Sequence, residues 1–294
     1  MNFKRLISLL LLAMLATQAA GSAPHYDNAG DLPPVQDTAL RQQLAREVCD
    51  AGYCELVATD QLAVALVVMP TGQPARLAMI NGHNMMYAAS LPKVAILLGA
   101  MVSSQRGELE LTPAAMEDLD RMIRVSCNDC ATRILALVGR DKLLQILQEP
   151  QFDFYDAERA GGLWVGKDYA SANAYQRDPI KGLSHAATPY QVARLYYRLN
   201  NGDLLDEKHG RIMKDMLDEP GIDHKFVRGL SAEDAHIEMR KSGGWESYHA
   251  DSVLVSHPEG KYIAIALVQD DEGNAILESL ADLLDRLARG RASP

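Results

Sequence analysis

Residues 88–97 read AASLPKVAIL and begin the segment that decides the fold. Ser90 and Lys93 stand three residues apart where apolar residues start to recur at helical spacing, so the hydroxyl and the amine share one face of a predicted helix. A serine hydroxyl becomes nucleophilic when a base takes its proton, and a desolvated lysine has a pKa low enough to do so. The pattern predicts a nucleophile at Ser90 with Lys93 as its base. A simple helix cap is the alternative for Ser90.

Two further segments continue the pattern along the chain. Residues 126–128 (Ser-Cys-Asn) begin a predicted helix, and residues 241–243 (Lys-Ser-Gly) end a predicted strand. Each alone has a structural explanation as a helix cap, a first-turn polar residue or a solvated strand end. In this order and on these element types, they indicate one active site built from three elements.

The order Ser-x-x-Lys, Ser-x-Asn, Lys-Ser-Gly resembles the active-site motifs of class A β-lactamases and penicillin-binding proteins. The flanking stretches MIRVSCNDCATRIL (residues 122–135) and ATPYQVARL (residues 187–195) are also similar to this class A-like serine hydrolase family, and the resemblance covers about residues 58–287. It implies an α/β plus all-α fold of the β-lactamase/transpeptidase type, in which an antiparallel sheet is flanked by helices and a helical lobe is inserted.

Predicted strands at both ends of the chain and helices between them fit this fold. Strands are predicted at residues 62–69, 76–80, 251–256 and 262–269, and helices after Asp37 or Thr38, after Thr188-Pro189 and at residues 275–289. The expected organisation is a linker at residues 24–37, a discontinuous α/β lobe at residues 38–98 and 226–290, and an all-α lobe at residues 99–225. The all-α lobe includes a long active-site loop at about residues 154–187.

The residue types and the resemblance together imply a role for each site residue. Ser126 would relay a proton between Lys93 or Lys241 and the leaving nitrogen, and Asn128 would bind an amide of the substrate. Lys241 and Ser242 would bind a substrate carboxylate.

The oxyanion of the reaction would need two N–H donors. The strand from Gly243 to Trp245 would supply the second one, with Trp245 as the expected donor.

The chain departs from the family pattern at three places. Cys127 stands where the family usually has an acid, and the interval from Ser90 to Ser126 is shorter than in typical class A enzymes. Class A β-lactamases hydrolyse their acyl-enzyme through a glutamate-bound water. Between Lys167 and Pro189 there is no glutamate, and Asp168 and Asp178 are the acids that could replace it.

The N-terminal residues predict export. Lys4 and Arg5 precede an apolar run at residues 6–16 and then small residues, which is the layout of a signal peptide at residues 1–23. The run is shorter than the ~20 residues that a membrane span needs, so we expect no stable membrane insertion. The mature protein is expected to be periplasmic or secreted after cleavage of the signal peptide.

Export also makes disulfides plausible for the four cysteines. Cys49 with Cys54 is the favoured pair. Cys127 and Cys130 allow four interpretations: a local bridge, a metal pair, a redox dithiol or two small buried helix residues.

The formal net charge of -10 over 294 residues argues against nucleic-acid binding, and no cofactor or metal is implied. The expected partner is a small molecule, either a β-lactam or a cell-wall peptide-like substrate. Three functions stay open: a β-lactamase-like serine hydrolase, a D-Ala-D-Ala carboxypeptidase, transpeptidase or related esterase, and a sensor that stays acylated. A fourth function class is a structural relic that catalyses no reaction.

Overall fold

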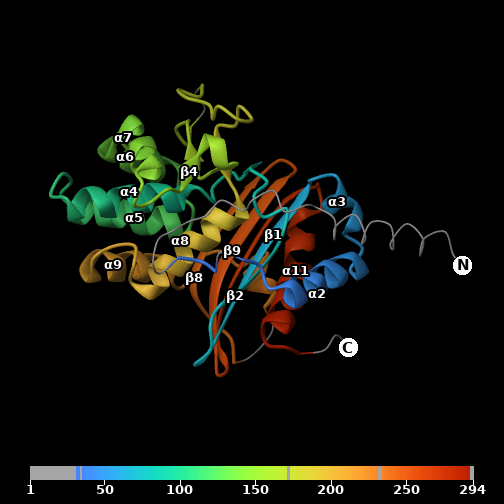
Figure 1. The fold of residues 1–294 in the computed structure, drawn as a ribbon. Coiled ribbons are helices and arrows are strands. Elements are labelled where there is room, and N and C mark those ends of the chain that lie inside the picture. The colour runs from blue at the N-terminus through green and yellow to red at the C-terminus, as the bar shows by residue number, and fades with distance from the viewer. Residues whose placement is uncertain (1–30, 34, 171–172, 231–233, 292–294) are drawn as a thin grey trace, which may run out of the picture.

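An antiparallel sheet of five strands, in the order β2-β1-β10-β9-β8, forms the centre of the computed structural model (Figure 1). The strands are β1 (Leu62–Pro70), β2 (Arg76–Ile80), β8 (His236–Trp245), β9 (Tyr248–His257) and β10 (Gly260–Gln269). The strands predicted at residues 62–69, 76–80, 251–256 and 262–269 are therefore confirmed. β2 and β8 are the two edges, and β8 carries the Lys-Ser-Gly segment.

The structure describes residues 31–33, 35–170, 173–230 and 234–291. The predicted signal peptide at residues 1–23 and the first part of the linker predicted at residues 24–37 lie outside the described residues. Within the described ranges, no helix is long and apolar enough to cross a membrane.

Helices cover both faces of the sheet because its central strands are apolar on both sides. Along β1, residues 64, 66 and 68 point into one core and residues 63, 65 and 67 into the other. The first core is covered by α2 (Thr38–Asp50), α3 (Cys54–Ala58), α10 (Phe226–Gly229) and α11 (Gly273–Ala288). On the opposite face, α8 (Pro189–Asn201) packs against β1 and β10.

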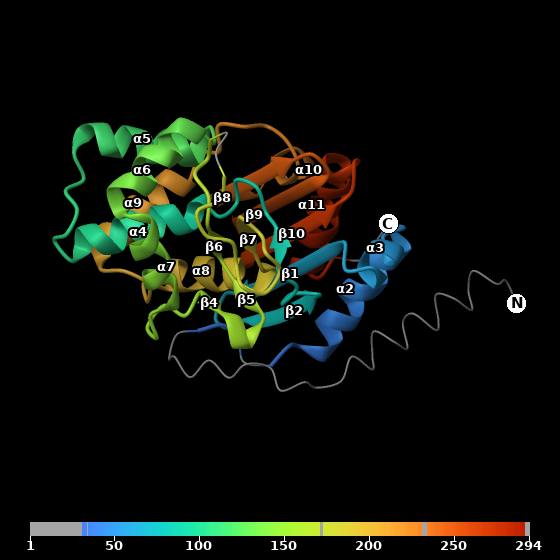
Figure 2. The same ribbon diagram turned by 90° about the horizontal axis from the view of Figure 1, so that it is seen from above.

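A helical lobe lies beside the sheet, on the side away from α2, α3 and α11 (Figure 2). Its central helix is α4 (Lys93–Gln105), which is buried on every side from Lys93 to Ser103. The helices around it are α5 (Pro113–Arg124), α6 (Asn128–Val138), α7 (Arg140–Gln148) and α9 (Glu207–Leu217). The residue boundaries proposed for the two lobes stay a prediction.

The segment predicted as a long loop at residues 154–187 carries short elements. They are β4 (Tyr155–Asp156), the 3-10 helix η1 (Ala157–Arg159), β5 (Gly161–Gly162), β6 (Trp164–Val165) and β7 (His185–Ala187). Strands of two or three residues leave no periodic signal in a sequence. β7 pairs with β3 (Met86–Tyr87), so this segment is tied to the chain just before Ser90.

Four residues before α2 contact the body of the protein: Asp31, Leu32, Gln36 and Asp37. Asp37 caps α2 by accepting an N–H of its first turn at 2.9 Å. The Asp31 carboxylate pairs with Arg194 of α8 at 2.7 Å, and the two side chains are 2% and 0% exposed. A buried ion pair therefore fixes this part of the predicted linker to α8.

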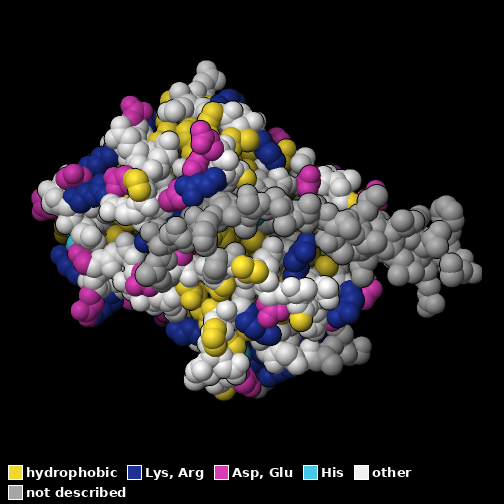
Figure 3. Space-filling view, in the orientation of Figure 1, with side chains coloured by type: hydrophobic (Ala, Val, Ile, Leu, Met, Phe, Trp, Pro, Cys, Tyr) yellow, Lys and Arg dark blue, Asp and Glu magenta, His cyan; other side chains and the backbone are white. Residues whose placement is uncertain are grey.

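Charged side chains of both signs are interspersed over the face seen in Figure 3. This mixture differs from the clustered cations with which proteins follow a phosphate backbone.

Replacing Arg194 by Met is expected to lower the free energy of unfolding by about 3 kcal/mol, because the Asp31 carboxylate would stay buried without its partner. Urea unfolding followed by circular dichroism measures this change. Arg211→Met is the matched control, since Arg211 and its partner Glu207 are 69% and 87% exposed, and it should leave stability nearly unchanged. Equal stability of the two variants would contradict the structural role given to Asp31 and Arg194.

Candidate active site

Ser90 lies in the turn that joins β3 to α4. The Lys93 N–H donates to the Ser90 carbonyl at 3.2 Å, which starts the helix. Ala89 has a φ of +47°, a left-handed conformation that non-glycine residues adopt only when their surroundings enforce it. The Tyr169 hydroxyl donates to the Ala89 carbonyl at 3.1 Å. The strained turn presents a half-buried Ser90 at the N-terminus of α4.

The Lys93 side chain is fully buried and turns toward the start of α6. Its Nζ donates to the Ser126 carbonyl at 2.7 Å and to Asn128 Oδ1 at 2.7 Å, and it lies 3.3 Å from Ser126 Oγ. It also lies 4.6 Å from the centre of the Tyr169 ring. Burial lowers the pKa of Lys93 to about 7, so neutral and charged amine coexist near neutral pH. No hydrogen bond joins Lys93 Nζ to the Ser90 hydroxyl in the described structure.

Ser126 links two buried amines. Its Oγ lies 3.3 Å from Lys93 Nζ and accepts a hydrogen bond from Lys241 Nζ at 3.0 Å. Burial, and then the nearby Lys93 charge, lowers the pKa of Lys241 well below its ordinary value. Ser126 has a φ of +59°, so this residue is also held in a left-handed conformation. The three predicted motifs therefore meet at one hydroxyl.

The turn at Ser126 is followed by a disulfide between Cys127 and Cys130. Cys127 is also the N-cap of α6, where its sulfur accepts the Cys130 N–H at 3.1 Å. The sulfur thus takes the capping position that an acidic side chain often occupies. The second disulfide joins Cys49 to Cys54, between α2 and α3.

Strand β8 meets the turn that carries Ser90 at Gly243. A Cβ placed on Gly243 would lie 2.2 Å from the Ala88 carbonyl oxygen and 2.9 Å from the Ser90 nitrogen. No side chain fits at such distances, so glycine is required by the contact between the sheet edge and the turn. Trp245 ends the strand with a 61% exposed side chain.

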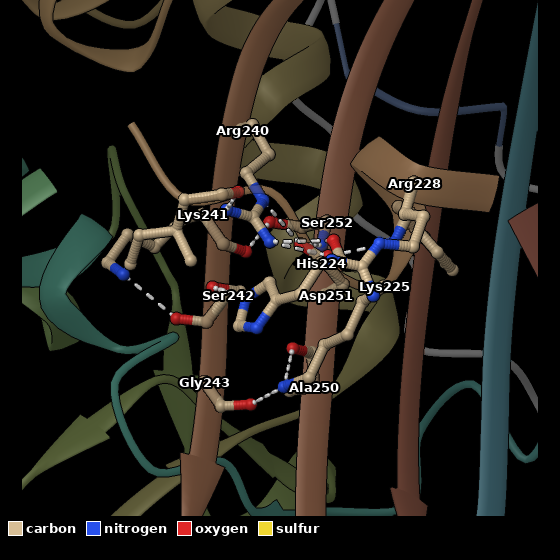
Figure 4. Close-up of polar contacts among 12 residues, drawn as sticks. His224, Lys225, Arg228, Arg240, Lys241, Ser242, Gly243, Ala250, Asp251 and Ser252 are labelled. Carbon is tan, nitrogen blue, oxygen red and sulfur yellow. Dashed lines mark hydrogen bonds and ion pairs between the residues drawn. The ribbon is translucent and has the colours of Figure 1, made fainter. Parts of the chain in front are cut away.

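The segment before β8 adds His224 and Lys225, which the motifs did not reveal. His224 Nε2 lies 3.1 Å from Ser242 Oγ. Burial, and then the charges of Arg240 and Lys225, lowers the pKa of His224 to about 4, so its imidazole is neutral at neutral pH. The buried Lys225 ammonium donates to the main-chain carbonyls of Gly243 and Ala250, as Figure 4 shows.

Positive charge exceeds negative charge around β8. The buried Asp251 carboxylate pairs with Arg240 through bonds of 3.0 and 2.9 Å. Lys93, Lys225 and Lys241 are buried as well, and none of them forms an ion pair with a carboxylate among the described residues. The site is therefore suited to a negatively charged ligand, although the whole chain is acidic.

Asp168 and Asp178 are the candidates to replace the missing glutamate, but the carboxylates of both make other hydrogen bonds. The Asp168 carboxylate accepts two hydrogen bonds from Arg140, at 2.8 and 2.6 Å. Asp178 is buried and accepts main-chain N–H groups of residues 180, 181 and 183. The structure brings neither of them into hydrogen-bond contact with Lys93. In the described ranges, no three His, Cys, Asp or Glu side chains are grouped to hold a metal ion.

Two aromatic rings from the segment at residues 154–187, Tyr169 and His185, lie near Lys93. The Tyr169 ring lies against Lys93, and the His185 ring lies 4.2 Å from the Tyr169 ring. His185 Nε2 contacts the Lys167 carbonyl at 2.9 Å, and burial lowers the pKa of His185 to about 4. Tyr169 stands next to Asp168 in the sequence, but nothing in the local pattern distinguishes it from an ordinary loop tyrosine.

Comparison with solved structures shows the same fold. The chain is similar to PBP-A, with 18% identity and a TM-score of 0.64 over 88% of this chain and 99% of that chain. A PBP-A mutant in an acyl-enzyme complex with penicillin G matches with 19% identity and a TM-score of 0.64, over 88% and 100%. A β-lactamase from Chitinophaga pinensis matches with 17% identity and a TM-score of 0.64, over 85% and 98%. No curated protein matches the chain in sequence.

The model of the β-lactamase enzyme family matches residues 114–289, which is more than half of the chain. This match includes the Ser126 and Lys241 segments, and the solved structures that share the fold include class A β-lactamases. These findings support a serine hydrolase of the β-lactamase or penicillin-binding kind in general. The chain belongs to the β-lactamase enzyme family.

Proposed function

We propose that the chain is an exported serine hydrolase in which Ser90 forms an ester with a β-lactam or a related amide, and that this ester is hydrolysed slowly. The arrangement of Lys93, Ser126 and Lys241 carries the proposal, because two buried amines share one hydroxyl beside the Ser90 turn. A structural role alone would not require two desolvated lysines without carboxylate partners.

In the proposed acylation, the Ser90 oxygen attacks the carbonyl carbon of the substrate while its proton passes to the neutral Lys93 amine. A carbon–oxygen bond forms, and negative charge develops on the carbonyl oxygen. The carbon–nitrogen bond then breaks, and the leaving nitrogen receives a proton through Ser126 Oγ. The hydrogen bond between the Ser90 hydroxyl and Lys93 Nζ would form in the substrate complex, since catalytic hydrogen bonds often tighten only there.

Two main-chain N–H groups would stabilise the oxyanion. The first belongs to Ser90, at the N-terminus of α4. The second is expected from β8, whose successive N–H groups point alternately toward β9 and away from it. The Gly243 carbonyl faces β9, so the N–H of Gly244 faces the open edge of the sheet. This alternation favours Gly244 over the neighbouring Trp245 as the donor.

The other site residues would bind the substrate. Lys241, Ser242 and the neighbouring His224 would hold a carboxylate, in keeping with the excess of positive charge around β8. Asn128 would offer its amide to the amide side chain of the substrate. Both groups occur in β-lactams and in cell-wall peptides.

Slow hydrolysis is expected because no carboxylate of the described residues contacts Lys93 to serve as a second base for the attacking water. The neighbours of Lys93 are the Ser126 carbonyl, the Asn128 amide and the Tyr169 ring, and none of these can take a proton from water. Asp168 and Asp178 are committed to other contacts. A Ser90 ester with a β-lactam that lasts favours, as the second candidate, a D-Ala-D-Ala carboxypeptidase or transpeptidase, or a sensor that stays acylated.

The first experiment follows the intact mass of the protein after mixing with penicillin G, from seconds to hours. We expect an adduct that persists in the wild type and is absent from Ser90→Ala. A fleeting adduct with full hydrolysis of the penicillin would contradict slow deacylation. Neither adduct nor hydrolysis, with D-alanyl peptides also unreactive, would refute the proposed chemistry.

The acylation rate should rise with pH as the Lys93 amine becomes neutral. With a Lys93 pKa of about 7, the rate constant should increase up to about tenfold per pH unit below pH 7 and by less between pH 7 and pH 7.5. His185 and His224 have pKa values of about 4 and are neutral throughout this range. This rise is measured as the acylation rate constant with nitrocefin, by stopped flow, from pH 5 to pH 7.5. Lys93→Met should lose acylation, and a variant that kept it would exclude Lys93 as the base.

Loss of the Cys127–Cys130 disulfide should slow acylation roughly tenfold, because Ser126 would lose the bridge and cap that fix its turn. The measurement compares the double variant Cys127→Ala/Cys130→Ala with the wild type. Cys49→Ala/Cys54→Ala is the matched control, since it removes the disulfide between α2 and α3. Equal losses in both variants would mean a general effect on folding.

A further inference from the structure

Lys225 occupies a strained and buried position behind β8. It is the N-cap residue of α10, with a φ of +54° that lysine rarely adopts, and it is only 1% exposed. Its Nζ reaches the Gly243 carbonyl of β8 and, at 3.3 Å, the Ala250 carbonyl of β9 (Figure 4). The backbone thus adopts an unfavourable conformation at the residue whose ammonium enters the sheet.

The charge of Lys225 is directed at peptide groups and not at a carboxylate. The nearby Asp251 binds Arg240 through both oxygens and accepts the N–H groups of Phe226 and Ser252. Among the described residues, Lys225 forms no ion pair. A side chain that only linked β8 to β9 would not need the charge of Lys225, because a neutral donor could bind the same carbonyls.

The Gly243 carbonyl belongs to the same peptide group as the Gly244 N–H. The described chain contains no cis peptide bond, so this carbonyl and this N–H point in opposite directions. Gly243 and Ala250 lie opposite each other, and one Nζ contacts both carbonyls, so both face the space between β8 and β9. The Gly244 N–H therefore points out of the sheet edge, where the chain is exposed.

We propose that Lys225 is a positioning residue for acylation: its ammonium fixes and polarises the Gly243–Gly244 peptide and makes the Gly244 N–H a stronger donor to the developing oxyanion. A positive charge on the carbonyl end of a peptide draws electron density from the N–H at the other end, as in hydrogen-bonded chains that polarise one another. The inference rests on the proposed function of Ser90.

The surroundings of Lys225 make its charge dependent on pH. Burial is the main influence and lowers the pKa of Lys225 to about 8; the Asp251 charge opposes this effect, and Arg240 adds to it. The His224 and His249 rings, whose own pKa values are lowered by burial, and the buried Lys241 are the other titratable groups close to it. The ammonium is thus present below pH 8 and lost above it, so acylation should decline through pH 8 after its rise near pH 7.

The experiment compares wild type, Lys225→Met and Arg228→Met by two measurements. Methionine keeps the length of the lysine side chain and removes the donor. Arg228→Met removes a 56% exposed cation from the same short helix. The first measurement is the pH titration of the Gly244 amide by NMR of glycine-labelled protein, which needs no substrate. The second is the acylation rate constant with nitrocefin, separated from the apparent dissociation constant.

In the wild type and Arg228→Met, the Gly244 amide shift should titrate near pH 8, and the acylation rate should fall over the same range. In Lys225→Met, that titration and that decline should both disappear. The acylation rate constant below pH 8 should drop by about tenfold to a hundredfold, with little change in the dissociation constant.

An unchanged alkaline decline, or a Gly244 amide that does not follow Lys225, would overturn the inference. A purely structural lysine would change rate, affinity and melting temperature together and leave the shape of the pH profile as it was. Failure of the proposed function has a different signature: the Gly244 amide would still respond to Lys225, but no Ser90 adduct would form in any variant.

Discussion

The contact between Gly243 and the turn before α4 is the constraint on which the rest of the site depends. The sheet edge and the helical lobe meet there with no room for a side chain. Because they meet at the backbone, Lys241 from the sheet and Lys93 from the helix both reach Ser126. A wider spacing would leave two lysines buried in separate lobes, each without the hydroxyl that they share.

Burying several cations near one another is costly, and the structure offsets this cost mainly with neutral oxygens. Lys93 binds a carbonyl and an amide, Lys241 binds a hydroxyl and a carbonyl, and Lys225 binds two carbonyls. Of the four buried cations around β8, Arg240 alone has a carboxylate partner within the described part of the chain, Asp251. The resulting positive potential is local, since the chain as a whole carries a formal charge of -10. An anionic ligand would complete the balance of charge.

The fold and the three motifs could be predicted because each rests on local patterns. The apolar runs of the strands, the cap at Thr188 and the Ser90–Lys93 spacing are all readable within a few residues. Lys225 and His224 could not be found in this way, because each acts on a residue of β8 that lies 18 positions later in the chain. The carboxylate of Asp168 likewise looks available in the sequence, and only the fold brings Arg140 to it.

The contact between the Lys93 amine and the Tyr169 ring has a consequence for observing the site. The phenol ring is buried, its hydroxyl is bonded to the Ala89 carbonyl, and the Lys93 amine and the His185 ring both lie close to it. Any step that protonates or deprotonates Lys93 changes the field across that ring. The site therefore contains its own chromophore, and ultraviolet difference spectroscopy can follow the proton without a coloured substrate.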